Sequence, residues 1–150
     1  MAHTFTRLLI HVVFSTADRA PLLVDVIRPD VHAYLGGIVR EWGGTAVAIG
    51  GTADHVHMLL QLGADKNVAD CLRVAKTNSS RWLHEKWPER RSFAWQRGYG
   101  AFTVSASNAD TVLRYIVGQE EHHRKMSFED EFLSLLRKHG VSFDPDHVFD

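Results

Sequence analysis

Apolar positions recur along the chain with two different periods, and these periods predict a short series of strands and helices. A run of apolar and β-branched residues over 7–14 predicts a buried strand. Helical spacing of apolar residues over 26–42 predicts a helix that ends at the paired glycines 43–44. A second strand over 45–49 then leads through a hairpin into a third strand that begins at His55.

The second half of the chain predicts further helices around a fourth strand. Asn67 is a good N-cap for a helix over 68–87. A basic, irregular stretch follows, and 93–105 is expected to be a loop that leads into the fourth strand. The next helix is predicted to begin at Ser107 or Asn108.

Two helices are expected to close the chain. The first runs through Tyr115 to about His123, and the second is a short amphipathic helix over 128–138 that ends at Gly140. The order β-α-β-β-α-β followed by helices predicts an α+β, ferredoxin-like (RRM-like) fold, an antiparallel sheet with helices on one face plus a C-terminal tyrosine-bearing helix. We expect this arrangement to leave the other face of the sheet free, as nucleic-acid-binding domains often do.

Composition and charge add a few constraints. A length of 150 residues, with 45% hydrophobic and 23% charged residues, suits a single domain over 1–150. The formal net charge of -1 hides an asymmetry, because basic residues outnumber acidic ones over 66–99 and acidic residues dominate 119–150. The single cysteine, Cys71, leaves no intrachain disulfide and fits a reducing compartment. The sequence shows neither a signal peptide nor an apolar run long enough to cross a membrane, so a cytoplasmic location is expected.

The most informative motif is the run Asp54-His55-Val56-His57 at the head of the third strand. Successive side chains of a strand point to opposite faces, so the two histidines share one face and the apolar residues between and after them share the other. Histidine is the commonest metal-binding side chain, and the pair is therefore a candidate metal site. The same spacing is compatible with two polar residues on a hydrated face.

The helix around Tyr115 offers further chemistry. Tyr115, Gln119 and His122 lie at i, i+4 and i+7 on one stripe. A divalent cation on the histidine pair would polarise a phosphate, and the phenol could then attack phosphorus. The amide oxygen of Gln119 would be the third protein ligand, and such a mixed set suits Mn²⁺ better than Mg²⁺. The simpler interpretation of Tyr115 is a half-buried packing residue.

Basic and aromatic side chains gather between these two motifs. The candidate phosphate contacts are Arg73, Lys76, Arg81, Arg90, Arg91 and Arg97. The interleaved aromatic residues are Trp82, Trp87, Phe93, Trp95 and Tyr99. Basic groups bind phosphates and flat rings stack on unpaired bases, so this segment favours single-stranded nucleic acid. Packing of Trp82 and Trp87 in the core is the alternative.

Taken together, these motifs resemble the single-tyrosine HUH transposases of the insertion-sequence 200/605 group. The histidine run matches the HUH motif, and 114–119 resembles the tyrosine helix of that group. The stretch 76–81 resembles the basic helix between the motifs, and 95–102 and 119–123 are similar to the C-terminal half of such proteins. The resemblance covers nearly the whole chain, in order.

The resemblance implies a specific activity. Such proteins are homodimers that cut and rejoin single-stranded DNA at element ends marked by hairpins, through a 5′-phosphotyrosine link and a free 3′-hydroxyl. Carried over to this chain, the nucleophile is Tyr115, and His55, His57 and Gln119 hold Mg²⁺ or Mn²⁺. No nucleotide cofactor is expected. A domesticated relative that acts on repeated chromosomal hairpins would look the same in sequence.

Three other classes of protein share parts of this pattern. A histidine-triad hydrolase needs a third alternate histidine, and Leu59 stands at that position. A non-catalytic nucleic-acid-binding module would need the basic helix but not Tyr115. Replication initiators and relaxases of the wider HUH class use the same chemistry but are usually larger.

Overall fold

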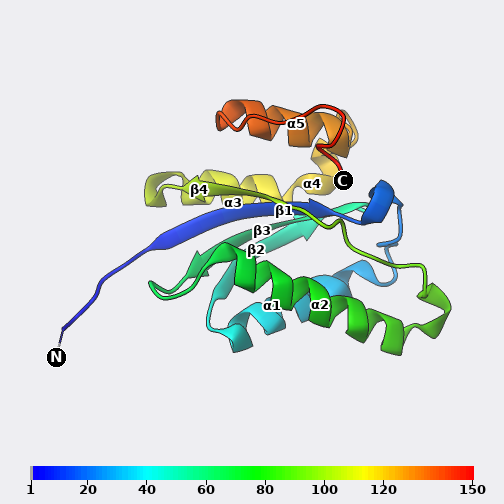
Figure 1. The fold of residues 1–150 in the computed structure, drawn as a ribbon, viewed down its shortest axis with the longest axis horizontal. Coiled ribbons are helices and arrows are strands. Elements are labelled where there is room, and N and C mark those ends of the chain that lie inside the picture. Colours follow the sequence, from blue (N-terminus) through cyan, green and yellow to red (C-terminus); the bar gives the residue numbers. More distant parts are fainter. Residues whose placement is uncertain (1) are drawn as a thin grey trace.

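The sheet of the protein has four strands and is antiparallel throughout. The structure is a computed structural model that describes residues 2–150. The strands lie in the order β2-β3-β1-β4, and their bounds are β1 (Leu8–Ser15), β2 (Thr45–Gly51), β3 (His55–Leu62) and β4 (Gly100–Val104). This order and the alternation with helices confirm the predicted α+β, ferredoxin-like fold (Figure 1).

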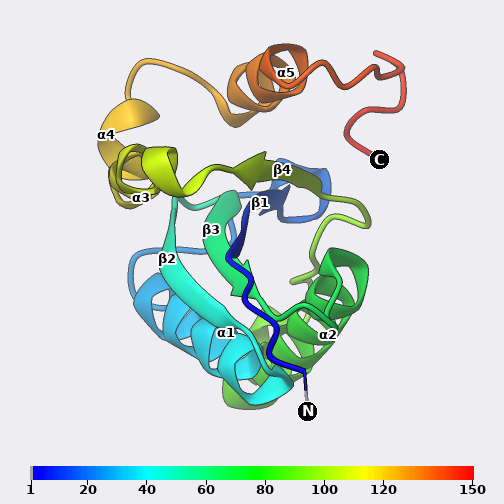
Figure 2. The ribbon, with the colours of Figure 1, turned by 90° about the vertical axis from the view of Figure 1, so that its left-hand side faces the viewer.

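Two long helices cover one face of the sheet. They are α1 (Arg28–Trp42) and α2 (Val68–Lys86), and Figure 2 shows both below the sheet. The predicted N-cap of α2 is confirmed, since the Asn67 side chain accepts a hydrogen bond from the Asp70 amide. The β3 side chains on this face, Val56, Met58 and Leu60, are fully buried in the main hydrophobic cluster.

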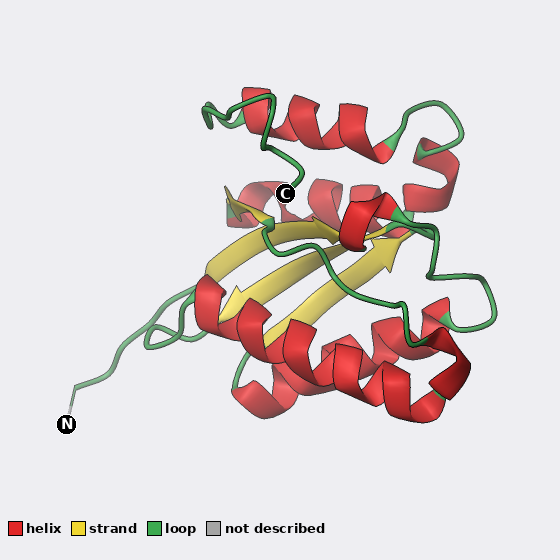
Figure 3. Ribbon diagram, turned by 45° about the vertical axis from the view of Figure 1, so that its right-hand side comes forward, coloured by secondary structure: helices red, strands yellow, loops and turns green. Residues whose placement is uncertain are grey.

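The opposite face of the sheet is covered as well, contrary to the expectation of a free face. It carries α3 (Ala109–Val117), α4 (Gln119–His122) and α5 (Phe128–Lys138) (Figures 2 and 3). Ile116 of α3 packs on Leu59 of β3, and Phe132 of α5 packs with Phe102 of β4. The amphipathic patterns of these helices require an apolar partner, and the sheet provides it.

The helix expected from residue 107 or 108 to about 123 is interrupted. Residues 106–108 form a short 3-10 turn, and Gly118 separates α3 from α4. Asn108 occupies the N-cap position of α3 without a capping hydrogen bond from its side chain, whereas Asp110 lies in the first turn as expected. The break at Gly118 redirects the chain, so that Gln119 turns toward the sheet and is buried.

A glycine sets how closely α3 approaches the sheet. A Cβ atom built on Gly50 of β2 would lie 1.9 Å from the backbone oxygen of Ile116. No other residue type fits there without moving the helix. The second strand, predicted over 45–49, extends through Gly50 and Gly51, and Gly50 lets α3 bring Tyr115 near the histidine strand.

Candidate active site

His55 and His57 open β3 and point to the face that α3, α4 and α5 cover. Both rings are fully buried, with centroids 5.1 Å apart. The period of the strand accounts for this placement, because the intervening Val56 enters the core on the other side. The expectation that the two histidines share a face is therefore confirmed, since both rings contact Glu131.

Side chains from α3 and α4 of the same chain lie beside these two histidines. The ring of Tyr115 lies 5.7 Å from that of His57, centroid to centroid. Gln119, at the start of α4, has its Oε1 atom 2.9 Å from His55 Nε2. The stripe predicted from the i, i+4, i+7 spacing thus reaches the histidines, and His122 Nε2 lies 3.4 Å from the Tyr115 hydroxyl.

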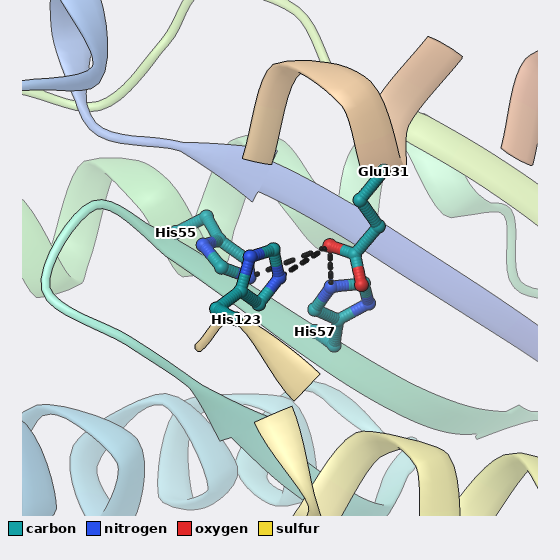
Figure 4. A group of neighbouring side chains, drawn as sticks. All are labelled: His55, His57, His123 and Glu131. Carbon is teal, nitrogen blue, oxygen red and sulfur yellow. Dashed lines mark hydrogen bonds and ion pairs between the residues drawn. The ribbon is translucent and has the colours of Figure 1, made fainter. Parts of the chain in front are cut away.

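A carboxylate from α5 occupies the centre of this group (Figure 4). Glu131 Oε1 lies 2.9 Å from His57 Nε2 and 2.9 Å from His123 Nε2. The other oxygen, Oε2, accepts hydrogen bonds from the Tyr115 hydroxyl and, at 3.1 Å, from the Gln119 amide nitrogen. The Glu131 side chain is only 2% exposed, so its charge is compensated almost entirely by these neighbours.

These contacts fix the protonation of the residues around the carboxylate. Burial by itself would raise the pKa of Glu131, but hydrogen bonds from His123 and His57 hold this pKa well below its usual range. Burial lowers the pKa of His57 to about 4. Burial and the adjacent carboxylate both raise the pKa of Tyr115. At neutral pH the site therefore holds an ionised Glu131, a neutral His57 and a protonated phenol.

The outward-facing ring nitrogens of the histidines are all engaged. His55 Nδ1 lies 2.8 Å from Asp54 Oδ1, and His123 Nδ1 lies 2.6 Å from the Met126 backbone oxygen. His57 Nδ1 lies 2.8 Å from Nε2 of the buried His11. Such partners orient imidazoles that bind metals and turn the Nε2 atoms inward.

The orientation of Gln119 makes the site suited to a cation. Its amide nitrogen donates to Glu131 Oε2 and to the Tyr115 backbone oxygen, which directs Oε1 at His55 Nε2. His55 Nδ1 donates to the Asp54 carboxylate, so in a neutral ring Nε2 presents a lone pair to an acceptor oxygen. Two electron-pair donors, His55 Nε2 and Gln119 Oε1, then face each other, and a positive ion bound between them would remove their repulsion. The buried cluster His55, His57, His123 and Glu131 could hold a metal ion.

Tyr115 can be reached from the surface. It lines a cavity of about 310 Å³ between α3, α5 and the edge of β4, together with Glu131. The basic and titratable side chains on the same walls are His11, His122, Lys138 and His139. The cavity is therefore a place where a phosphate could approach the phenol.

The predicted basic residues separate into two groups. Arg73, Lys76 and Arg97 surround one groove of about 370 Å³ between α2 and the loop before β4, and Tyr99, which is 38% exposed, lines it. Arg81 is exposed on α2, while Arg90 and Arg91 lie beyond the end of that helix. Of the aromatic residues, Phe93 and Trp95 are buried in the core.

Lys76 is placed differently from the other basic residues. Its ammonium donates to the backbone oxygens of Gln96, at 2.8 Å, and Gly98, and it lies over the rings of Phe14 and Tyr99. Burial lowers its pKa to about 8. In this arrangement Lys76 fastens the loop before β4 to α2 instead of facing solvent.

Three residues of the site were not selected from the sequence. Glu131 lies in an acidic triplet whose place on the buried face of an amphipathic helix is the only signal that it turns inward. His123 follows the predicted stripe but was given no role, and His11 lies inside an apolar strand. Their proximity to His57 depends on how separate elements pack.

Comparisons with known proteins give a family for the chain and structures of similar fold. The family model described as "Transposase IS200 like" matches residues 4–119. A crystal structure of a candidate transposase from Deinococcus radiodurans is similar with a TM-score of 0.66 and 24% identity, covering 77% of this chain and 93% of that one. A REP-associated tyrosine transposase bound to a REP hairpin has a TM-score of 0.58 and 12% identity, over 77% and 68%. No curated protein matches the sequence significantly.

Proposed function

This chain belongs to the IS200-like transposase family, and from that premise we propose that it cleaves and rejoins single-stranded DNA through a covalent link to Tyr115. Membership of the family makes it a DNA transposase. The observation that carries the finer proposal is the meeting of Tyr115 with His57 in one chain, at 5.7 Å between ring centroids. No helix of the described residues is long and apolar enough to cross a membrane.

The proposed reaction is a transesterification. The Tyr115 oxygen attacks the scissile phosphorus, the bond from phosphorus to the 3′ oxygen breaks, and a 5′-phosphotyrosine and a 3′-hydroxyl result. The proton of the phenol is directed toward Glu131, and the leaving oxygen takes up a proton. A later 3′-hydroxyl reverses the step and releases the tyrosine. Because one phosphodiester replaces another, no nucleotide cofactor is required.

The residues present fit a divalent metal, Mg²⁺ or Mn²⁺. His55 and His57 turn their Nε2 atoms inward, and the Gln119 amide oxygen lies beside them as the proposed third ligand. A bound ion would neutralise charge on the scissile phosphate and orient it. Asp54 and His11 hold the two rings in place through their Nδ1 atoms.

We further propose that the groove lined by Arg73, Arg97 and Tyr99 binds the single-stranded DNA. Exposed guanidinium groups attract phosphates, and an exposed ring can stack on an unpaired base. The similar structure bound to a REP hairpin supports a hairpin-bearing substrate. Such a hairpin could mark the end of an element or a repeated chromosomal site. The homodimer implied by the sequence resemblance remains part of this proposal.

A cleavage assay tests the proposed nucleophile. A pool of 3′-labelled, hairpin-bearing single-stranded oligonucleotides is incubated with the protein and Mn²⁺, and covalent adducts are separated on a denaturing gel. Tyr115→Phe should abolish the adduct while DNA binding stays within about twofold. Tyr34→Phe is the matched control and should retain the adduct. An adduct that persists in Tyr115→Phe would show that another residue is the nucleophile.

A further inference from the structure

We propose that α5 carries a metal ligand into the site, so that Glu131 and His123 join His55 and His57 as four ligands, beside Gln119, around one ion. In this proposal the docking of α5 and the binding of the ion are coupled. The proposal rests on the proposed function only in taking the histidine pair of β3 as metal-binding. It adds two ligands that lie beyond residues 4–119, the part of the chain that the family model matches.

The distances between ligand atoms suit a single ion. Glu131 Oε1 lies 2.9 Å from His57 Nε2, 2.9 Å from His123 Nε2 and 3.5 Å from His55 Nε2. Ligand atoms at about 2.1 Å from an ion are separated from their neighbours by about 3.0–3.4 Å in octahedral or tetrahedral geometry. All four ligand atoms lie within 4.8 Å of one another, and Figure 4 shows them converging.

His123 has the hydrogen-bonding pattern of a ligand. Its Nδ1 atom must donate, because the partner is the backbone oxygen of Met126 at 2.6 Å. Nε2 is then the ring atom that faces Glu131 Oε1, to which it donates in the absence of an ion. His55 is held in the same way by Asp54. The Nε2 atoms of His55 and His123 and a carboxylate oxygen thus face one point, where a divalent cation would take the place of the His123 proton.

α5 is built to hold Glu131 at this point. The Ser127 hydroxyl caps the helix by accepting from the Asp130 amide. Phe128 and Phe132 are buried in the cluster that joins α5 to the sheet. Glu131 therefore lies on the inward face of the helix between two apolar anchors. If α5 leaves the sheet, the ligand leaves with it, so metal binding must favour the docked state by linkage.

The docked helix leaves the nucleophile accessible. Tyr115 still lines the cavity of about 310 Å³ when Glu131 contacts it. The carboxylate joins two functions, since Oε1 faces the imidazoles and Oε2 accepts from the Tyr115 hydroxyl. Glu131 thereby positions the phenol relative to the ion. Three imidazoles and one carboxylate favour a transition-metal ion such as Mn²⁺ over Mg²⁺.

Direct Mn²⁺ titration of the full chain without DNA, followed by electron paramagnetic resonance, tests the ligand set. Glu131→Gln should weaken Mn²⁺ binding at least about tenfold, and His123→Ala should weaken it as well. Glu129→Gln makes the identical change two residues away on α5, on a side chain that is 44% exposed and pairs with Arg19. This control should bind Mn²⁺ within about twofold of the unsubstituted protein. Equal affinity for Glu131→Gln and Glu129→Gln would overturn the proposal.

Hydrogen exchange of the unsubstituted protein provides a second test that does not depend on how a variant folds. Saturating Mn²⁺ should slow exchange of the α5 amides at least about tenfold, whereas α1, on the other face of the sheet, should change little. Unchanged exchange in α5 would overturn the coupling. If Mn²⁺ binding depends on Glu131 but no DNA is cleaved, this inference stands and the proposed function fails. If DNA is cleaved but Glu131→Gln leaves the affinity for Mn²⁺ unchanged, the proposed function stands and this inference fails.

Discussion

Glu131 Oε1 lies 2.9 Å from His57 Nε2, although 74 residues separate the two in sequence. The contact joins the start of β3 to the first turn of α5 across the face of the sheet that carries the site. His57 is presented by the alternation of a strand, and Glu131 by the inward face of an amphipathic helix. The site therefore depends on how closely the helices of this face approach the sheet.

Gly50→Ala tests that dependence. The added Cβ would meet the Ile116 backbone oxygen, so α3 must move and carry Tyr115 with it. Overpacking of this kind costs about 1–3 kcal/mol, and DNA cleavage should fall more than DNA binding. The measurements are a thermal melt and the adduct assay.

Gly37→Ala is the control for this substitution. Gly37 lies in α1 with nothing within 4 Å of a built Cβ, so alanine should raise stability by about 0.5–1 kcal/mol and leave cleavage unchanged. Equal activity of the Gly50→Ala and Gly37→Ala proteins would contradict the account.

The sequence was sufficient for the parts of the site that follow from local periodicity. The histidine pair repeats within β3, the Tyr115 stripe keeps its spacing across the break at Gly118, and the structure brings the two together as expected. The Glu131 contact could not be predicted, because it requires the register of α5 on the sheet. The expected free face was wrong for the same reason, since the helices after β4 pack on it.

The position of Lys76 illustrates a different limit of sequence analysis. Its spacing with Arg73 and Arg81 on α2 suggests one exposed basic face. In the fold, the Lys76 ammonium donates hydrogen bonds to the backbone oxygens of Gln96 and Gly98. Charge patterning identifies basic helices, but it does not show which cations stay available for phosphates.

Replacing the exposed arginines of the groove tests the DNA path. Arg73→Ala and Arg97→Ala should each weaken binding of single-stranded DNA and reduce the slope of log K against log salt by about 0.7. Arg40→Ala, an exposed arginine of α1, is the control and should leave the slope unchanged. Fluorescence anisotropy at several salt concentrations measures both quantities. An unchanged slope in both groove variants would place the DNA elsewhere.

The stability of the protein should depend on the pH through His32. Burial lowers the pKa of His32 to about 4, and its Nε2 atom has no hydrogen-bond partner among residues 2–150. The unfolded chain binds the proton near pH 6.5 and the folded chain near pH 4, so stability falls as pH drops between these values, by up to about 3 kcal/mol.

Chemical denaturation at pH 7.5 and pH 5 measures this dependence. His32→Gln removes one titrating group and should reduce the difference between the two pH values, while His11 and His57, whose pKa values burial lowers to about 3 and about 4, keep the remainder. His3→Gln, at an exposed position near the N-terminus, should preserve it. The same pH dependence in both variants would exclude His32 as its source.

Mixing two inactive variants tests whether the site forms within one chain. Tyr115 and His57 meet in the same chain here, so Tyr115→Phe mixed with His57→Ala should remain inactive at any ratio. Each variant lacks part of every site that it can form alone. Recovery of adduct formation in the mixture would show that a second copy supplies the tyrosine.

The most direct measurement of the central claim is the position of the covalent bond. The adduct trapped with a hairpin-bearing oligonucleotide is digested with protease and nuclease, and tandem mass spectrometry locates the residual nucleotide phosphate. The account predicts the modification on Tyr115 alone, linked to the 5′ phosphate. Modification of Tyr34, Tyr99 or a histidine, or a 3′ linkage, would contradict it.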